Sequence, residues 1–306
     1  MDNHLVVSEQ GLTAYDSISL AIRWQRLSGE RTHAPVLAAG LVLVSSSSGF
    51  YALDSTNGSV VWQSNRDINL FAPVVKDGVV YLASESGVLQ ALELAGGRLI
   101  WRRQLPGWIY PPGLGSELLY TGGSDGNLWA IHLEDGSIRW RRDLGQELVY
   151  SPVILRDGTV ITTTFAGEVF AFSPMGRLHW QSRLSVNFMP PFELGERILF
   201  SGIDQQLYAL DSKTGKRHWS TSLDGRLAAP LVLNKHTALA ALDDGRLLEI
   251  DPQDGNLRLL GRADGEPVAS PHVQDGQTVL FLKSFGAPKA IILKRQQSGV
   301  NSIKEM

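Results

Sequence analysis

Tryptophan recurs along this chain at a nearly constant interval, and that interval constrains the fold more than any other feature. Six of the eight tryptophans lie 38 to 40 residues apart, at Trp24, Trp62, Trp101, Trp140, Trp180 and Trp219. One further step of 40 residues reaches Leu259, which we interpret as an apolar substitute. A fixed period of about 40 residues indicates a repeat architecture. It therefore overrides the two separate domains that a length of 306 residues would ordinarily favour.

The rest of each repeat keeps the phase of its tryptophan. A proline follows 11 or 12 residues later, as at Pro35, Pro73 and Pro112. Four short runs rich in Val, Ile, Leu, Tyr and Trp fill each period, separated by Gly, Asp, Asn and Ser. This pattern predicts four antiparallel strands joined by tight turns, with no segment of helical periodicity. The sequence therefore predicts an all-β fold, a β-propeller made of four-stranded antiparallel blades.

The number of blades has two interpretations. Eight tryptophan-strand cycles can be traced, the last of them eroded around Gly299 and Ile303, but only seven proline strands. The chain starts at what reads as a second strand, Leu5-Val6-Val7. Either eight blades form and the first lacks its innermost strand, or seven blades close and the N-terminal strands lie along an edge. We favour eight blades in a single propeller domain over residues 1–306, because terminal repeats are expected to be atypical.

A short motif links each turn to the tryptophan that follows it. The pattern Ala-x-Asp-x-x-x-Gly-x-x-x-Trp occurs at Ala52 to Trp62 and again at Ala209 to Trp219. We interpret the tryptophans as packing devices between blades. The glycine is expected to supply a positive φ, and the aspartate to accept hydrogen bonds from nearby backbone amides.

The segment Ala209 to Trp219 resembles the docking repeat of the pyrroloquinoline-quinone-like β-propellers, and the resemblance covers essentially the whole chain. One branch of that family consists of dehydrogenases that hold the quinone and a calcium ion. Another consists of compact propellers without cofactor, including a periplasmic lipoprotein scaffold for outer-membrane β-barrel assembly. The length and repeat of this chain are similar to the second branch, and its lack of cysteine argues against the first.

Composition and motifs exclude several classes of function. The chain has 28 Lys+Arg against 31 Asp+Glu, so it offers no net attraction to nucleic acid. No apolar run approaches the roughly 20 residues of a membrane helix. No metal-ligand motif, nucleophile elbow or phosphate loop occurs. We therefore predict no catalytic residue, no cofactor and no metal site.

Two groups of residues are candidates for binding a protein partner. The loops before the proline strands carry large apolar side chains, and we select Phe71, Trp108, Tyr110, Tyr150 and Phe188. These residues either form a binding surface or plug the channel of the propeller. Two consecutive tryptophan strands carry arginines, and here we select Arg102, Arg103, Arg141 and Arg142. These arginines either dock an acidic partner or simply keep an edge strand solvated.

These observations, with the resemblance, favour a non-enzymatic scaffold that binds protein partners in the bacterial periplasm or cell envelope, as a monomer. The alternatives are a reduced quinone-dependent dehydrogenase and a ligand-sensing module. The residues shown contain no signal peptide and no cysteine for a lipid anchor, so a cytoplasmic location is the alternative.

Overall fold

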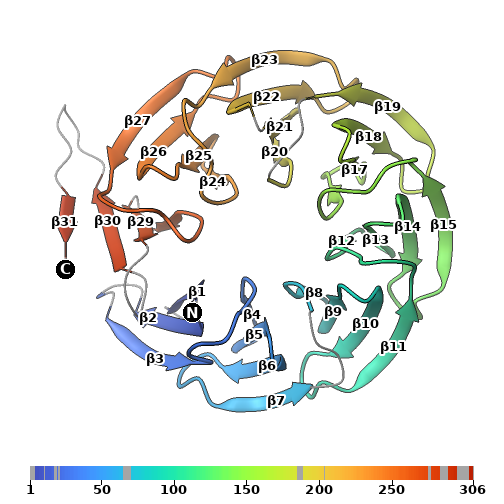
Figure 1. Cartoon of the computed structure of the whole chain (residues 1–306), viewed down its shortest axis with the longest axis horizontal. Helices are drawn as coiled ribbons and strands as arrows, with labels where there is room; N and C mark the ends of the chain where they lie inside the picture. The colour runs from blue at the N-terminus through green and yellow to red at the C-terminus, as the bar shows by residue number, and fades with distance from the viewer. Residues whose placement is uncertain are drawn as a thin grey trace. The chain divides into compact units, whose positions relative to one another are not determined.

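The structure is a computed structural model of the chain, and it contains strands and turns. It describes residues 4–9, 11–16, 19, 21–64, 70–184, 189–202, 204–274, 277–282, 289–294 and 303–305. Within these ranges there is no helix, and the predicted all-β class is confirmed. Eight antiparallel sheets follow one another through the described residues, each formed by strands consecutive in sequence (Figure 1). Seven of these sheets have four strands and the first has three, as expected for propeller blades.

Backbone contacts divide the chain into two compact units. Unit 1 comprises residues 1–166 and 170–178, and unit 2 comprises residues 167–169 and 179–306. The first four sheets belong to unit 1. Their strands are β1 (His4–Glu9), β2 (Gly11–Asp16) and β3 (Ile22–Arg26); β4 (Val36–Ala38), β5 (Leu41–Ser46), β6 (Gly49–Asp54) and β7 (Val60–Ser64); β8 (Val74–Lys76), β9 (Val79–Ala83), β10 (Val88–Glu93) and β11 (Leu99–Gln104); and β12 (Gly113–Leu114), β13 (Leu118–Gly122), β14 (Asn127–His132) and β15 (Ile138–Asp143).

The fifth sheet includes residues of both units, and the last three sheets belong to unit 2. The strands are β16 (Val153–Ile154), β17 (Val160–Thr163), β18 (Glu168–Phe172) and β19 (Leu178–Arg183); β20 (Phe192–Leu194), β21 (Arg197–Ser201), β22 (Gln206–Asp211) and β23 (Arg217–Ser222); β24 (Val232–Asn234), β25 (Thr237–Ala241), β26 (Arg246–Ile250) and β27 (Leu257–Arg262); and β28 (His272–Gln274), β29 (Gln277–Leu282), β30 (Lys289–Lys294) and β31 (Ile303–Glu305).

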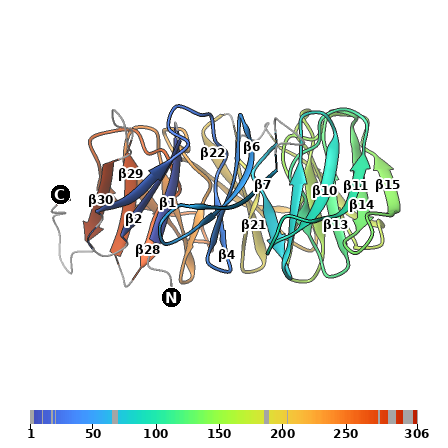
Figure 2. The same ribbon diagram turned by 90° about the horizontal axis from the view of Figure 1, so that it is seen from below.

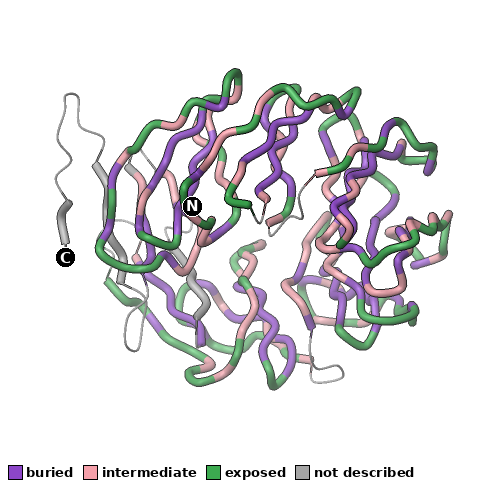
Figure 3. The backbone as a smooth tube through the Cα atoms, turned by 45° about the horizontal axis from the view of Figure 1, so that its top comes forward, coloured by how far each residue is buried: buried purple, intermediate pink, exposed green. Residues whose placement is uncertain are grey.

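Burial differs systematically between the strands of one sheet. The second and third strands, such as β9 and β10, are buried along almost their whole length, whereas the fourth strand β11 is mostly exposed apart from Trp101. Figure 3 shows how buried and exposed segments alternate along the chain. Apolar clusters fill the space between consecutive sheets. One of them joins Leu89 and Trp101 to Leu119 and Ile131 of the next sheet. The core is thus a series of layers between sheets, which is why a single blade cannot be stable alone.

Because neighbouring strands are antiparallel, the turns of each sheet lie at two opposite ends of its strands (Figure 2). We name these two ends as sides. On one side the chain enters the first strand and turns from the second strand to the third; we call this the leading side. The opposite side, which we call the docking side, carries the turn from the third strand to the fourth. Isolated bridges such as Leu70 to Ser84 and Ile109 to Gly123 join the two segments of the leading side.

The docking side explains the tryptophan period. Trp101 pairs with Ala91, and a β-bulge follows in the register. Its indole Nε1 donates to the carbonyl of Leu133 in the next sheet at 2.8 Å. A Cβ atom on Gly136 would lie 2.6 Å from the indole, so this position requires glycine, which also has a φ of +69°. The same indole bond joins Trp24 to Ser55, Trp62 to Leu94, Trp140 to Pro174, Trp180 to Ser212 and Trp219 to Pro252.

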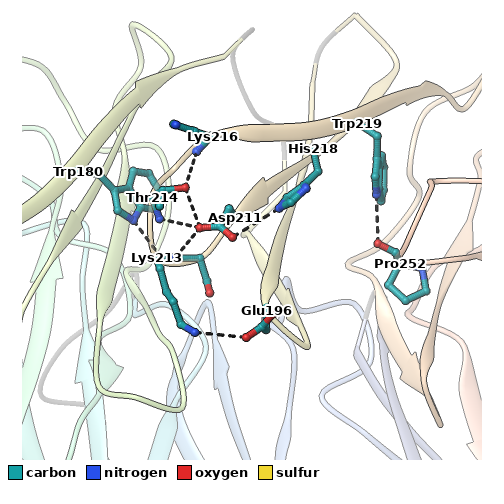
Figure 4. A network of polar contacts seen from close by, with 10 residues as sticks. Trp180, Glu196, Asp211, Lys213, Thr214, Lys216, His218, Trp219 and Pro252 are labelled. Carbon is teal, nitrogen blue, oxygen red and sulfur yellow. Dashed lines mark hydrogen bonds and ion pairs between the residues drawn. The ribbon is translucent and has the colours of Figure 1, made fainter.

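Figure 4 shows one turn of the docking side in unit 2, the turn that begins at Asp211, the last residue of β22. Asp211 Oδ1 accepts hydrogen bonds from the backbone amide of Thr214 at 2.8 Å and from its hydroxyl at 2.7 Å. The hydrogen bond from the Thr214 hydroxyl is the largest cause that lowers the pKa of the Asp211 carboxyl, and the bond from the Thr214 backbone amide lowers it further. The aspartate therefore fixes the turn that presents Gly215 to Trp180.

The structure corrects the interpretation of Leu259 as an apolar substitute for the docking tryptophan. The side chain of Leu259 is 56% exposed, so it does not dock as the tryptophans do. In this sheet the bulge lies two residues further along β27, so that Arg258 faces Glu249 and Leu259 faces Leu248. The alternation of side chains in a strand has a period of two, and a displaced bulge therefore turns Leu259 outward.

Candidate functional site

Four loops of unit 1 bring ring side chains together on the leading side. His33, Phe71, Tyr110 and Tyr150 each stand two residues before the first-strand proline of their repeat, and we call them the aromatic row. The centroids of His33 and Phe71 lie 5.7 Å apart, edge to face, and those of Phe71 and Tyr110 also 5.7 Å apart. Tyr110 acts electrostatically on Tyr150. The predicted residues Phe71, Tyr110 and Tyr150 thus belong to one continuous feature, which His33 extends.

Backbone and hydroxyl hydrogen bonds hold the loops of the aromatic row in place. The amides of Phe71 and Tyr110 donate to the carbonyls of Ala83 and Gly122 in the adjoining second strands, both at 2.9 Å. The carbonyl of Phe71 in turn accepts the hydroxyl of Ser45 at 2.7 Å. These rings therefore stand on fixed backbone rather than on free loop tips.

The aromatic row is uncharged at neutral pH. Burial, with the nearby Arg31 as a smaller cause, lowers the pKa of His33. Burial also raises the pKa of Tyr110 and of Tyr150, with smaller contributions from Glu147 and from Tyr110 respectively. All four rings are partly exposed. They therefore offer neutral, half-buried aromatic surface, a composition common in contacts between proteins.

Two aromatic side chains beside the row are strongly exposed. Trp108 is 43% exposed and Phe165 is 66% exposed. Their backbones are held, because Trp108 exchanges hydrogen bonds with Ser124, and the Phe165 amide donates to the Glu147 carbonyl at 2.8 Å. Large apolar side chains on rigid backbone are the typical anchors of a protein interface.

The sequence reasoning selected Trp108 but missed Phe165, although a signal existed. Phe165 occupies the turn between β17 and β18, where the equivalent turns carry Ser47, Glu85 and Ser124. A phenylalanine in place of a small or charged turn residue departs from the repeat, and no packing need explains it.

Carboxylates border this surface. Glu85 acts electrostatically on His33, and Glu147 acts on Tyr110. Asp125 has internal roles, since it accepts the indole of Trp129 at 2.9 Å and the Asn127 amide at 3.0 Å. The leading side of unit 1 therefore combines exposed aromatic anchors with a polar rim. We call Phe71, Trp108, Tyr110, Tyr150 and Phe165, with this rim, the anchor surface.

Comparisons with known proteins agree with the repeated four-stranded sheets described above. The chain matches the family model described as "Outer membrane protein assembly factor BamB" over residues 1–64, 66–189 and 166–284. The chain belongs to this family. Among curated BamB relatives it is 32% identical over 110 residues to that of Bordetella pertussis, 29% over 122 residues to that of Nitrosomonas eutropha, and 30% over 151 residues to that of Alkalilimnicola ehrlichii. These matches cover 34%, 38% and 48% of this chain, and only 28%, 28% and 38% of the respective relatives.

Solved structures show the same fold. The crystal structure of BamB from Moraxella catarrhalis superposes with a TM-score of 0.77 at 18% identity, covering 98% of this chain and 94% of that one. The computationally designed Ika8 protein superposes with a TM-score of 0.79 at 13% identity, covering 94% of this chain and 92% of that one. The predicted β-propeller class is confirmed, and so is the pyrroloquinoline-quinone-like, BamB-type family.

Two of the four predicted arginines of this BamB-family chain join consecutive sheets. Arg103 Nε donates to the carbonyl of Gly136 at 2.6 Å, and Arg142 Nε donates to that of Gly176 at 2.8 Å. Arg26 makes the same bond to Gly58 at 2.9 Å. An arginine two residues after the tryptophan thus supports the glycine on which that tryptophan packs.

The other two arginines, Arg102 and Arg141, hold equivalent exposed positions on β11 and β15. The guanidinium of Arg141 lies 5.4 Å from the ring centre of Trp129. A partner role for Arg102 and Arg141 stays a prediction. The remaining predicted residue, Phe188, lies outside the described residues.

Neither a metal cluster nor a membrane-spanning helix is found in the described part of the BamB-family chain. No group of three or more His, Asp or Glu side chains there is placed to hold a metal ion. No helix in the same residues is long and apolar enough to cross a membrane.

Proposed function

We propose that this chain is a non-enzymatic propeller scaffold that binds protein partners during the assembly of outer-membrane proteins. The observation that carries the proposal is the anchor surface, where Trp108 and Phe165 project from hydrogen-bonded loops beside a neutral aromatic row. Membership of a family named for outer-membrane protein assembly supports the same process.

The chemistry of the anchor surface favours a protein over a small charged ligand. Its rings are neutral, because burial lowers the pKa of His33 and raises the pKa of Tyr110 and Tyr150. Exposed aromatic residues within a polar rim match the centre and border of a protein interface. The partner is therefore expected to present apolar side chains to Trp108 and Phe165.

The remaining parts of the proposal concern the whole chain. We place it in the periplasm, where outer-membrane proteins are assembled, and treat residues 1–306 as one propeller domain that acts as a monomer. The repeat of sheets through the described residues supports this organisation. A partner role for Arg102 and Arg141 on the exposed fourth strands is a secondary part of the proposal.

The function is tested by complementation. A Gram-negative strain that lacks its own BamB-family protein receives this chain behind an export signal, and the amount of folded β-barrel protein in its outer membrane is measured. We expect the chain to restore that amount. We expect the double variant Trp108→Ala/Phe165→Ser to fail, because the anchors that contact the partner are removed.

A matched control separates binding from folding. Met175 is also a large apolar residue of unit 1 and is 58% exposed, but it lies on the docking side. Met175→Ser should complement fully, and both variants should keep the thermal midpoint of the unchanged protein. Full complementation by the double variant, at equal protein levels, would contradict the role of the anchor surface.

A further inference from the structure

A glutamate stands beside each of the two exposed anchors, Trp108 and Phe165. The backbone amide of Phe165 donates to the carbonyl of Glu147 at 2.8 Å, which places these two residues on adjoining segments. Glu147 also acts electrostatically on Tyr110, so its charge reaches the aromatic row. Glu147 is exposed, and its carboxylate makes no hydrogen bond or ion pair within the described residues.

The loop of Trp108 lies against the second glutamate. The amide of Ile109, the next residue, donates to the carbonyl of Ser84 at 3.3 Å, and Glu85 follows Ser84 in its turn. Glu85 is exposed and acts electrostatically on His33. Like the first glutamate, it makes no hydrogen bond or ion pair in the part of the chain that the structure describes. Both carboxylates are therefore available to a partner that covers the anchors.

The loops and turns of the anchor surface carry an excess of negative charge. Their described residues are 27–35, 45–48, 70–73, 84–87, 105–112, 123–126, 144–152 and 164–166. These segments contain one cation, Arg31, and four carboxylates, at Glu30, Glu85, Asp125 and Glu147. Their formal net charge thus equals the −3 of the whole chain, so the charges of the remaining sequence balance. His33 adds no positive charge at neutral pH, because burial lowers its pKa.

The single cation is not placed to neutralise the anchors. Arg31 lies in the loop before the second sheet, whereas Trp108 lies in the loop before the fourth sheet and Phe165 in a turn of the fifth. Two of the carboxylates have internal partners, since Asp125 accepts an indole and Glu30 accepts a serine hydroxyl. Such bonds hold a carboxylate in place but leave its charge. The aromatic anchors therefore stand in a negative field.

We propose that the anchor surface binds a basic segment of the partner protein, in which Lys or Arg stands next to the apolar side chains that contact Trp108 and Phe165. In this contact Glu85 and Glu147 face the cationic side chains of the segment. The inference rests on the proposed function, because it gives the chemistry of the partner which that function requires. The same negative field repels anionic lipid head groups and phosphates, so it favours a protein segment over either of them.

Three peptides that differ only in charge serve as probes. They are acetyl-Lys-Phe-Lys-Leu-Lys-amide and its two analogues with serine or glutamate in place of every lysine. Binding is followed by the indole resonances of protein labelled with ¹⁵N-tryptophan. The Trp108 resonance is assigned with Trp108→Phe, and the buried Trp101 serves as reference.

The expected result is a saturable shift of the Trp108 resonance and an order of affinities set by charge. An exposed ion pair changes a binding constant by about twofold to fivefold, so at about 20 mM salt the lysine peptide should bind roughly tenfold tighter than the glutamate peptide. The serine peptide should lie between them. At about 0.5 M salt the three affinities should converge, because exposed charges are screened.

Removal of the two glutamate charges gives the sharpest test. Glu85→Gln/Glu147→Gln should weaken binding of the lysine peptide by roughly fivefold at low salt and leave the serine peptide unaffected. The matched control is Glu117→Gln/Glu134→Gln, which removes the same charge from exposed residues on the docking side of unit 1. The control should bind all three peptides as the unchanged protein does. All four glutamates are exposed, so both variants should keep the thermal midpoint.

Several outcomes would overturn the assignment of a basic segment. They are an unchanged Trp108 resonance, equal affinities for the three peptides at low salt, and equal effects of the two double variants, which would mark a response to net charge alone. These results are separable from complementation. Peptide binding that ignores charge overturns the basic segment but leaves standing a rescue that depends on Trp108 and Phe165. A lysine preference without rescue overturns the proposed function instead.

Discussion

A glycine and a tryptophan four residues later form one motif in the sequence but serve two different interfaces. Gly97 receives the indole of Trp62 from the preceding sheet, while Trp101 packs on Gly136 of the following sheet. The motif is therefore a link between three sheets. This explains why both residues recur with one period.

Gly97→Ala should destabilise the protein by about 2–4 kcal/mol. The new Cβ would lie 2.5 Å from the Trp62 ring, at a backbone φ of +68°, so overpacking and left-handed strain act together. The loss is measured as a lower midpoint in urea unfolding.

The adjacent residue provides the control for this prediction. A Cβ atom on Gly96 would meet no other atom within 4 Å, and the φ of Gly96 is not in the left-handed region. Gly96→Ala should change stability by less than about 0.5 kcal/mol. Equal effects of the two substitutions would show that contact with the indole is not the cause.

Asp211 gives a pH-dependent contribution to stability. The hydrogen bond from Thr214 is the main cause of its lowered pKa, so the folded state favours the carboxylate. The contribution is complete above the ordinary pKa of 3.8 and is lost as the pH falls through the lower, folded value. Asp211→Asn should cost about 0.5 kcal/mol at pH 7, a small value because the side chain is partly exposed, and the difference should vanish in acid. Unfolding midpoints between pH 2 and pH 7 test this, and a difference that grows in acid would contradict it.

At the scale of the strand and sheet, the seventh sheet shows what replaces a lost tryptophan. Glu249 stands where the first six sheets have alanine, and it is 9% exposed. It is paired with Arg258 and accepts the hydroxyl of Thr237 at 3.0 Å. A polar pair thus occupies the register that alanine and tryptophan hold in the first six sheets.

Arg258→Gln should destabilise the protein by about 1–2 kcal/mol, because it removes the cation that faces a buried carboxylate; the value is reduced because Arg258 itself is half exposed. The matched control is Arg98→Gln, which breaks a pair with Glu93 on the exposed part of another sheet and should leave thermal unfolding nearly unchanged. Equal midpoints for both variants would contradict the role assigned to Glu249.

Arginine positions within one strand have different roles, which residue type alone does not distinguish. Arg103 and Arg142 bond to glycine carbonyls of the next sheet, whereas Arg102 and Arg141 face outward. Strand alternation places neighbouring residues on opposite faces, so a charged run divides into a structural half and an exposed half.

At the scale of the whole molecule, residues 1–306 are proposed as one domain although backbone contacts separate two units. The apolar layers between consecutive sheets couple neighbours, so we expect a single cooperative unfolding transition. Scanning calorimetry tests this through agreement between the calorimetric and van't Hoff enthalpies. Two separate transitions would contradict the single-domain proposal.

The repeat, the strands and the all-β propeller class could all be predicted from the sequence, because period, turn chemistry and indole packing recur from blade to blade and reinforce one another. Most of the anchor surface could be predicted as well, since large apolar residues before the proline strands have no turn function. Features that depend on neighbouring sheets emerged only from the folded structure. Phe165 is exposed, Leu259 turns outward behind a displaced bulge, and Arg103 and Arg142 hold adjacent sheets. Each of these depends on atoms distant in the sequence or on a small change of register, and a pattern within one repeat contains neither.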